Sequence, residues 1–186
     1  MPGTQRRKPK QQRAQHTVEV VLQGTVRVLG REGVDAVTTN RIAEAAGVSI
    51  GSLYQYFPDK HSIFKALHAR HAQRVRQVIT ETLARHAGSP FETLLLALTD
   101  GLIDEHAAEP QQLHELLALQ PPTPGLRLAL GELITSKQPS GGARFVMPGV
   151  IDALVHDAVL ARPTGVSLAS AKEETARMIA GYLCAA

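Results

Sequence analysis

Two short helical segments joined by a glycine turn constrain the fold of this chain more than any other feature. Thr38 or Thr39 can cap a helix that runs to Ala46, because a threonine hydroxyl accepts from the free backbone N–H groups of a first turn. Gly47 suits a left-handed helix exit, and Ser49 can cap the next helix. A helix, a turn of about three residues that contains glycine, and a second helix form the helix-turn-helix pattern.

The segment after Ser49 has two different faces when its residues are placed at about 100° each on a helical wheel. Leu53 and Phe57 lie one turn apart and are expected to pack inward, with Ile50 and Tyr54 at the edges of that face. The opposite face carries small and hydrogen-bonding side chains: Gly51, Ser52, Gln55 and Tyr56.

A face of this kind suits a helix that enters the major groove of DNA. Small residues permit close approach, and the Gln55 amide can read adenine with two hydrogen bonds. The tyrosine hydroxyls can donate to phosphates, which fixes the register without reading the sequence. The alternative is a helix pair that only packs within the protein.

Charge is divided unevenly along the 186 residues. Residues 1–86 hold 14 Lys and Arg against 6 Asp and Glu, a balance of +8, whereas residues 87–186 have a balance of −5. This asymmetry suggests an N-terminal module that binds a polyanion, attached to a region with another task. A solvated charged surface is the alternative explanation.

Helical periodicity continues through the rest of the chain and predicts an all-α fold of two domains. Apolar residues recur at three- and four-residue spacing over 17–31, and a long helix over 59–87 is expected to begin at the cap Asp59. Ser89 as a cap, Pro90 at the first helical position and Glu92 as the partner of a capping box predict the next start. Further helical segments are expected at 90–107, 111–119, 126–137, 143–161 and 168–184.

Pro148 lies inside one of these expected segments, 143–161. Proline removes a backbone donor, so this helix is expected to kink there or to begin later.

The stretch TTNRIAEAAGVSIGSLYQYFPDKHSIF, residues 38–64, resembles the DNA-binding signature of the TetR family of bacterial transcriptional regulators. The shared features are the paired threonines, Gly47-Val48-Ser49, Leu53-Tyr54, Tyr56-Phe57 and Lys60. The resemblance implies phosphate contacts by Thr39, Tyr54, Tyr56 and Lys60. It also implies groove-facing positions for Asn40, Ile50, Gly51, Ser52 and Gln55, with Ser49 at the start of the same helix.

The same resemblance implies a domain organisation and a mode of action. We expect a basic flexible arm over 1–16, a helix-turn-helix DNA-binding domain over 17–64 and a ligand-binding and dimerisation domain over 65–186. The family likeness implies a homodimer on a palindromic operator, a repressor that a small-molecule effector releases, and a long helix that transmits the change. The last two helical segments resemble more loosely the helices through which the family dimerises, although an intrachain core would serve them equally well.

Effector-binding residues are expected among the few aromatic and polar side chains of the apolar C-terminal helices. The candidates are Phe91, His106, His114, Arg127 and Phe145. Each has a simpler explanation: the phenylalanines can be plain core, and the two histidines lie near expected helix ends, where a solvated histidine is common.

Enzyme and metal signatures are not found in the sequence. The eight histidines are scattered, and the segment HELLAL at His114 lacks the second histidine of the zinc-protease spacing. A phosphate-binding loop, a dinucleotide fingerprint and a G-x-S-x-G nucleophile elbow are also missing. No catalytic residue, metal or cofactor is therefore expected. Two other classes stay open: a ligand-independent DNA-organising protein with the same DNA-binding head, and an enzyme in the C-terminal domain.

A cytoplasmic location is expected from the N-terminal composition. Residues 1–16 are polar and basic and lack the apolar run of a secretory signal. No later stretch approaches about eighteen uncharged apolar residues, so no membrane association is expected.

Overall fold

The structure, a computed structural model, describes residues 7–118 and 141–184, and within these ranges the regular elements are all helices. The expected all-α class is confirmed. The helices are α1 Arg7–Glu32, α2 Thr39–Ala46, α3 Ile50–Tyr54, α4 Lys60–Arg85, α5 Phe91–Ala107, α6 Gln111–Ala118, α8 Gly141–Leu160 and α9 Leu168–Cys184. The expected helix over 126–137 lies outside the described residues. Within the described ranges, every helix is too short or too polar to cross a lipid bilayer.

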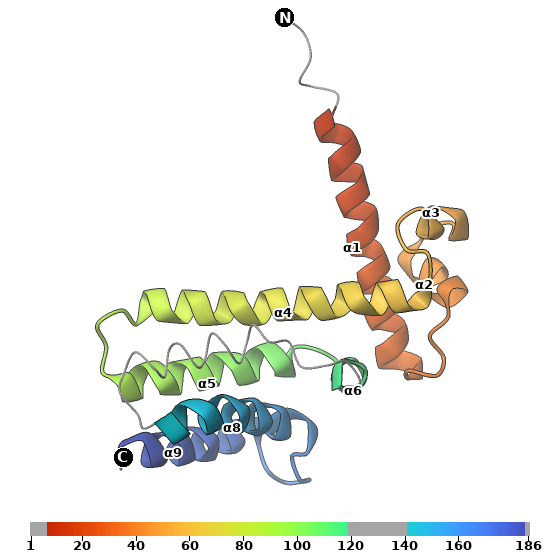
Figure 1. The fold of residues 1–186 in the computed structure, drawn as a ribbon. Coiled ribbons are helices and arrows are strands. Elements are labelled where there is room, and N and C mark those ends of the chain that lie inside the picture. The colour runs from red at the N-terminus through yellow and green to blue at the C-terminus, as the bar shows by residue number, and fades with distance from the viewer. Residues whose placement is uncertain (1–6, 119–140, 185–186) are drawn as a thin grey trace, which may run out of the picture.

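The helices gather into two groups that share α4 (Figure 1). Helices α1, α2 and α3 surround one end of α4, and α5 runs alongside α4. Helices α8 and α9 pack on α5, so α4, α5 and the α8–α9 pair form successive layers. We call residues 7–67 the head, and α5, α8 and α9 with the remainder of α4 the body.

Two hydrophobic cores correspond to these groups. The head core contains Leu29, Ile42, Leu53, Phe57 and Ile63, together with Leu113 and Leu116 of α6. The body core is built by Ile79, Leu98, Ile103, Val155 and Ile179, among others. Helix α6 therefore belongs to the head by its packing, although it follows α5 in the chain.

Gly24 permits an unusually close approach of α1 and α2. A Cβ atom at this position would lie 2.9 Å from both the backbone nitrogen and the Cβ of Ala46, a separation that real Cβ atoms do not adopt. Any larger residue at position 24 would push the two helices apart, because the obstacle is partly backbone.

Local capping explains where α4 begins. The Asp59 carboxylate accepts from the backbone N–H of Ser62 at 2.7 Å, and the Ser62 hydroxyl is 3.4 Å from the Asp59 backbone nitrogen. Asp59 is thus the expected cap. Its backbone hydrogen bond from Ser62 lowers the pKa of the carboxyl below its ordinary value.

Two expected helix boundaries were wrong. Helix α1 begins at Arg7, well before residue 17, so a part of the expected basic arm is helical. Pro90 itself is the cap of α5 and no side-chain hydrogen bond supports it, so Ser89 and Glu92 form no capping box.

Helix α8 begins at Gly141 and continues through Pro148. Of the two outcomes expected at this proline, a kink or a later start, the later start does not occur.

Candidate nucleic-acid interface and effector region

The turn between α2 and α3 is fixed by side-chain caps at both ends. Thr38, rather than Thr39, caps α2, and its hydroxyl accepts from the backbone N–H of Arg41 at 3.3 Å. Gly47 ends α2 with a φ of +68°, in the left-handed region that favours glycine. The Ser49 hydroxyl then accepts from the backbone N–H of Ser52 at 3.1 Å and starts α3. These caps set the direction of α3 relative to α2.

Helix α3 has one buried and one exposed face, as the wheel predicts. Leu53 and Phe57 are buried in the head core. Tyr54 is 50% exposed and Ile50 is 38% exposed. The wheel places Ile50 at the edge of the packing face, and in the structure this residue lies on the solvent-exposed side.

All ten residues expected to contact DNA are at least partly exposed. Two of them, Thr39 and Ser52, are half-buried. The other eight are exposed: Asn40, Ser49, Ile50, Gly51, Tyr54, Gln55, Tyr56 and Lys60. They come from the start of α2, from α3 with the turns on either side of it, and from the first residue of α4. Thr39 and Tyr54 join two of these elements, since their hydroxyl oxygens lie 3.2 Å apart in a hydrogen bond.

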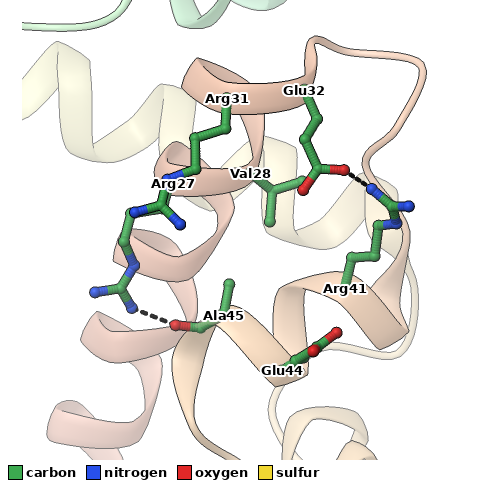
Figure 2. Close-up of a pocket in the computed structure, with 7 residues that line it drawn as sticks. All are labelled: Arg27, Val28, Arg31, Glu32, Arg41, Glu44 and Ala45. Carbon is green, nitrogen blue, oxygen red and sulfur yellow. Dashed lines mark hydrogen bonds and ion pairs between the residues drawn. The ribbon is translucent and has the colours of Figure 1, made fainter.

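A small polar pocket lies between α1 and α2 (Figure 2). The Arg27 guanidinium donates to the backbone carbonyl of Ala45 in the last turn of α2, where carbonyls lack partners within the helix. Arg41 on the opposite side forms an ion pair with Glu32. We interpret these two contacts as interactions that hold α2 against α1. They were not predicted from the sequence.

The expected effector residues have very different positions. His106 and His114 are 2% and 1% exposed, so the explanation of solvated histidines near helix ends is wrong for both. The physical reason is that the two rings stack on each other and meet side chains of α4 and α8, helices distant from them in the chain. Phe91 and Phe145 are helical residues whose side chains lie outside the description, and Arg127 lies outside the described residues altogether.

Two further histidines lie beside them that the sequence analysis did not propose as site residues. The ring of His71 in α4 has its centroid 4.9 Å from that of His106, and His156 in α8 lies 4.7 Å from His106. The four histidines come from four helices, so no spacing along the chain signals their proximity.

Comparison with known proteins identifies a family that the sequence of the head resembles. Residues 21–67 match the family described as bacterial regulatory proteins, tetR family. The nucleoid occlusion factor SlmA of Haemophilus ducreyi is 39% identical over 74 residues, which are 40% of this chain and 33% of that protein. The HTH-type transcriptional regulator AcrR of Shigella flexneri is 32% identical over 88 residues, 47% of this chain and 40% of that protein. The chain thus spans a third to two fifths of the length of these relatives.

The likeness in fold extends further than the likeness in sequence. A TetR-family transcriptional regulator from Streptomyces coelicolor superposes with a TM-score of 0.67, over 91% of this chain and 98% of that one, at 24% sequence identity. The helical body therefore has the arrangement seen in that structure. The sequence match over residues 21–67 thus shows that the head is similar to the N-terminal domain of bacterial regulatory proteins of the tetR family, and the likeness of the body is one of fold.

Proposed function

We propose that the chain is a cytoplasmic transcriptional repressor that binds a palindromic DNA operator as a homodimer and is released when a small effector enters its body. In this proposal α3 enters the major groove and the exposed residues around it contact bases and phosphates. The chain acts by binding and needs no catalytic residue.

The observation that carries the proposal is the exposed face of α3. Its caps and its buried residues fix the helix on the head, while Gly51 and Gln55 remain exposed. Outside its own helix backbone and chain neighbours, a Cβ atom added at Gly51 would meet only the Ser49 hydroxyl at 4.0 Å, so this position is open and a base edge can approach the backbone closely. The +8 charge of residues 1–86 favours the approach to phosphates.

The homodimer is supported by the outer face of α9. Met178 and Tyr182 are four residues apart, thus one turn apart on one face, and each is 52% exposed. A large apolar side chain in this position suits burial against a second copy. Met178→Asp places a charge in this interface and should convert the dimer into a monomer in sedimentation equilibrium, whereas Met178→Leu should remain a dimer.

Selection of binding sites from a random duplex library tests the proposal. A closed two-fold dimer presents two copies of α3, so the selected sites should be inverted repeats with half-sites about 34 to 36 Å apart, or a multiple of that distance. Footprinting on a selected site should protect both half-sites. A single unrepeated half-site bound by a monomer at micromolar concentration would contradict the proposal.

A ligand-independent DNA-organising protein is the second candidate, and the likeness to the nucleoid occlusion factor SlmA favours it. Mapping of the chain on its own chromosome separates the two. A regulator should occupy a few sites at promoters, whereas an organising protein should occupy many sites that are dispersed over the chromosome.

A further inference from the structure

Three histidines from three helices, two of them buried and one half-buried, converge at the junction of head and body. They are His71 of α4, His106 of α5 and His114 of α6, and one ring nitrogen of each lies within 4.8 Å of those of the other two. The ring centroids of His106 and His114 are 5.3 Å apart, and those of His71 and His114 are 5.7 Å apart.

Hydrogen bonds fix which nitrogen of two of these rings carries the proton. His106 Nδ1 lies 2.7 Å from the Leu102 carbonyl oxygen, and His114 Nε2 lies 2.7 Å from the His106 carbonyl oxygen. A carbonyl oxygen only accepts, so both of these ring nitrogens must be protonated donors. In a neutral ring the other nitrogen, His106 Nε2 or His114 Nδ1, then carries a lone pair.

These two lone pairs have no hydrogen-bond partner within the described part of the protein. His106 Nε2 and His114 Nδ1 are buried and unpaired there, and so is His71 Nδ1, a third ring nitrogen whose protonation no hydrogen bond fixes. Buried polar atoms in folded proteins are nearly always paired, so three unpaired ring nitrogens in one cluster require an explanation.

The protonation state of the three histidine rings agrees with a role as electron-pair donors. Burial lowers the pKa of His71 to about 3 and that of His106 to about 4, and it also lowers the pKa of His114. The three imidazoles are thus neutral near pH 7, which is the form that binds a metal ion. The nearby positive charge of Arg74 is matched by ion pairs with Glu105 and Glu109.

We propose that His71, His106 and His114 bind one divalent transition-metal ion of the kind that prefers imidazole ligands, such as Zn²⁺. The arrangement has the pattern of protein metal sites, in which a ligating histidine donates its second N–H to a backbone carbonyl and is thereby oriented. The site rests on its own geometry and goes beyond the proposed function, since it does not require that the head binds DNA.

The geometry needs only a small contraction to accommodate an ion. Zinc–nitrogen bonds are about 2.0 to 2.1 Å, which places tetrahedral ligand nitrogens about 3.3 Å apart. The ring nitrogens, now within 4.8 Å of one another, would have to approach to this value on binding, through rotation of the rings and shifts of the helices. His156 lies against His106 at the edge of the cluster, and a water molecule would supply the fourth ligand of a tetrahedral ion.

Titration of the full chain with Co²⁺, after removal of metals by a chelator, tests the proposal. Cobalt is a spectroscopic substitute for zinc, and ligand-field absorption should saturate at one ion per chain. The absorption should lack the sulfur-to-cobalt charge-transfer band that a Cys184 ligand would produce. Zn²⁺ should displace the cobalt and raise the thermal midpoint of the wild-type chain.

His71→Gln is the decisive variant because His71 is only half-buried, so its replacement disturbs the core less than His106→Gln or His114→Gln. Co²⁺ affinity should fall more than the roughly 10- to 100-fold lost when a residue that only orients a ligand is removed. His61→Gln, an exposed histidine on the same helix, is the matched control and should bind as the wild type does. Unfolding curves of the metal-free variants establish that each is folded.

Three results would overturn the site. One is a wild-type chain that binds no Co²⁺ at millimolar concentration. The second is a folded His71→Gln chain with the Co²⁺ affinity of the wild type, and the third is a His61→Gln chain that loses as much affinity as His71→Gln does. Either of the last two would locate the ion elsewhere.

Discussion

The head and the body of this protein hold their candidate sites in opposite ways. The head presents its site on an exposed face of one short helix, and neighbouring residues in the chain build that site. The body places its histidines in the interior, and each comes from a different helix. A surface site of contiguous residues can be recognised from sequence, whereas a buried site assembled by packing appears only when the helices are placed together.

The comparison with known proteins follows the same division. Sequence identity of 39% with a relative extends over only 74 residues, whereas the likeness in fold to a solved structure covers 91% of the chain at 24% identity. The family match in sequence lies in the head, at residues 21–67, whereas the likeness of the body is one of architecture. What the body binds must be derived from its own side chains.

The largest expected effect concerns the tightness of packing in the two regions. Gly24→Ala in the head would meet the backbone of Ala46 at 2.9 Å, whereas Gly101→Ala in the body would meet two side-chain atoms, Val78 Cγ1 at 3.0 Å and Thr82 Oγ1 at 3.9 Å. A side chain can move aside and a backbone cannot. We expect Gly24→Ala to lower the free energy of unfolding by about 1 to 3 kcal/mol, and Gly101→Ala to change it by less. Urea unfolding of both variants measures the difference, and equal losses would contradict it.

Gln55→Ala tests whether the head reads bases. If the amide makes two hydrogen bonds to one base, its loss should reduce discrimination at that position by about 1 to 3 kcal/mol. Repeated site selection with the variant would reveal relaxed preference at one position of each half-site. An unchanged preference would show that another residue lies in the groove.

Gly51→Ala separates fold from function within the head. Alanine is favoured over glycine inside a helix by up to about 1 kcal/mol, and nothing within 4 Å opposes a Cβ here apart from the Ser49 hydroxyl at that limit. The variant should be as stable as the wild type or more stable, yet it should bind DNA more weakly because the added methyl group lies toward the bases. An unchanged DNA affinity of the folded Gly51→Ala chain would contradict the assignment of this position to the groove-facing side of α3.

Lys60→Ala should have the smallest effect of these substitutions. It should change the DNA affinity and its salt dependence, and leave the base preference as it is. Lys60 is exposed and its ammonium group lies 5.7 Å from the centre of the Phe64 ring, within reach of solvent. Loss of one phosphate contact should weaken specific and non-specific DNA alike and reduce the slope of log affinity against log salt by about 1. A change in base preference would contradict its role as a phosphate contact.

The features that were predictable from the sequence are those decided by neighbours in the chain. Ser49, Gly47 and Asp59 act within one helical turn, and the sequence predicts all three correctly. Thr38 and Thr39 were equal candidates, and only the structure separates them, because Thr39 is instead bonded to Tyr54 in α3.

Other features depend on residues distant in the chain and were not predictable in this way. Gly24 looks like an ordinary helix interruption until α2 is placed against it. His106 looks solvated until α4 and α6 cover it. Pro90 shows a different limit, since the capping sequence on either side of it, Ser89 and Glu92, does not form the expected hydrogen bonds.

A physical connection between the two regions passes through α6. Leu113 and Leu116 pack in the head core, and His114 between them reaches the histidine cluster. An ion that draws His114 toward His106 and His71 would therefore act on a helix that packs against α1. We expect occupancy of the cluster and DNA binding to be coupled by this route.

The most direct test of the account is the DNA affinity of the chain at a selected operator, measured with and without saturating Co²⁺ in the wild type and in His71→Gln. The account predicts that Co²⁺ weakens binding by the wild type by roughly 5- to 150-fold, the usual range for coupled sites, and leaves His71→Gln unchanged. Equal wild-type affinities with the cluster occupied and empty would contradict the claim that the body controls the head.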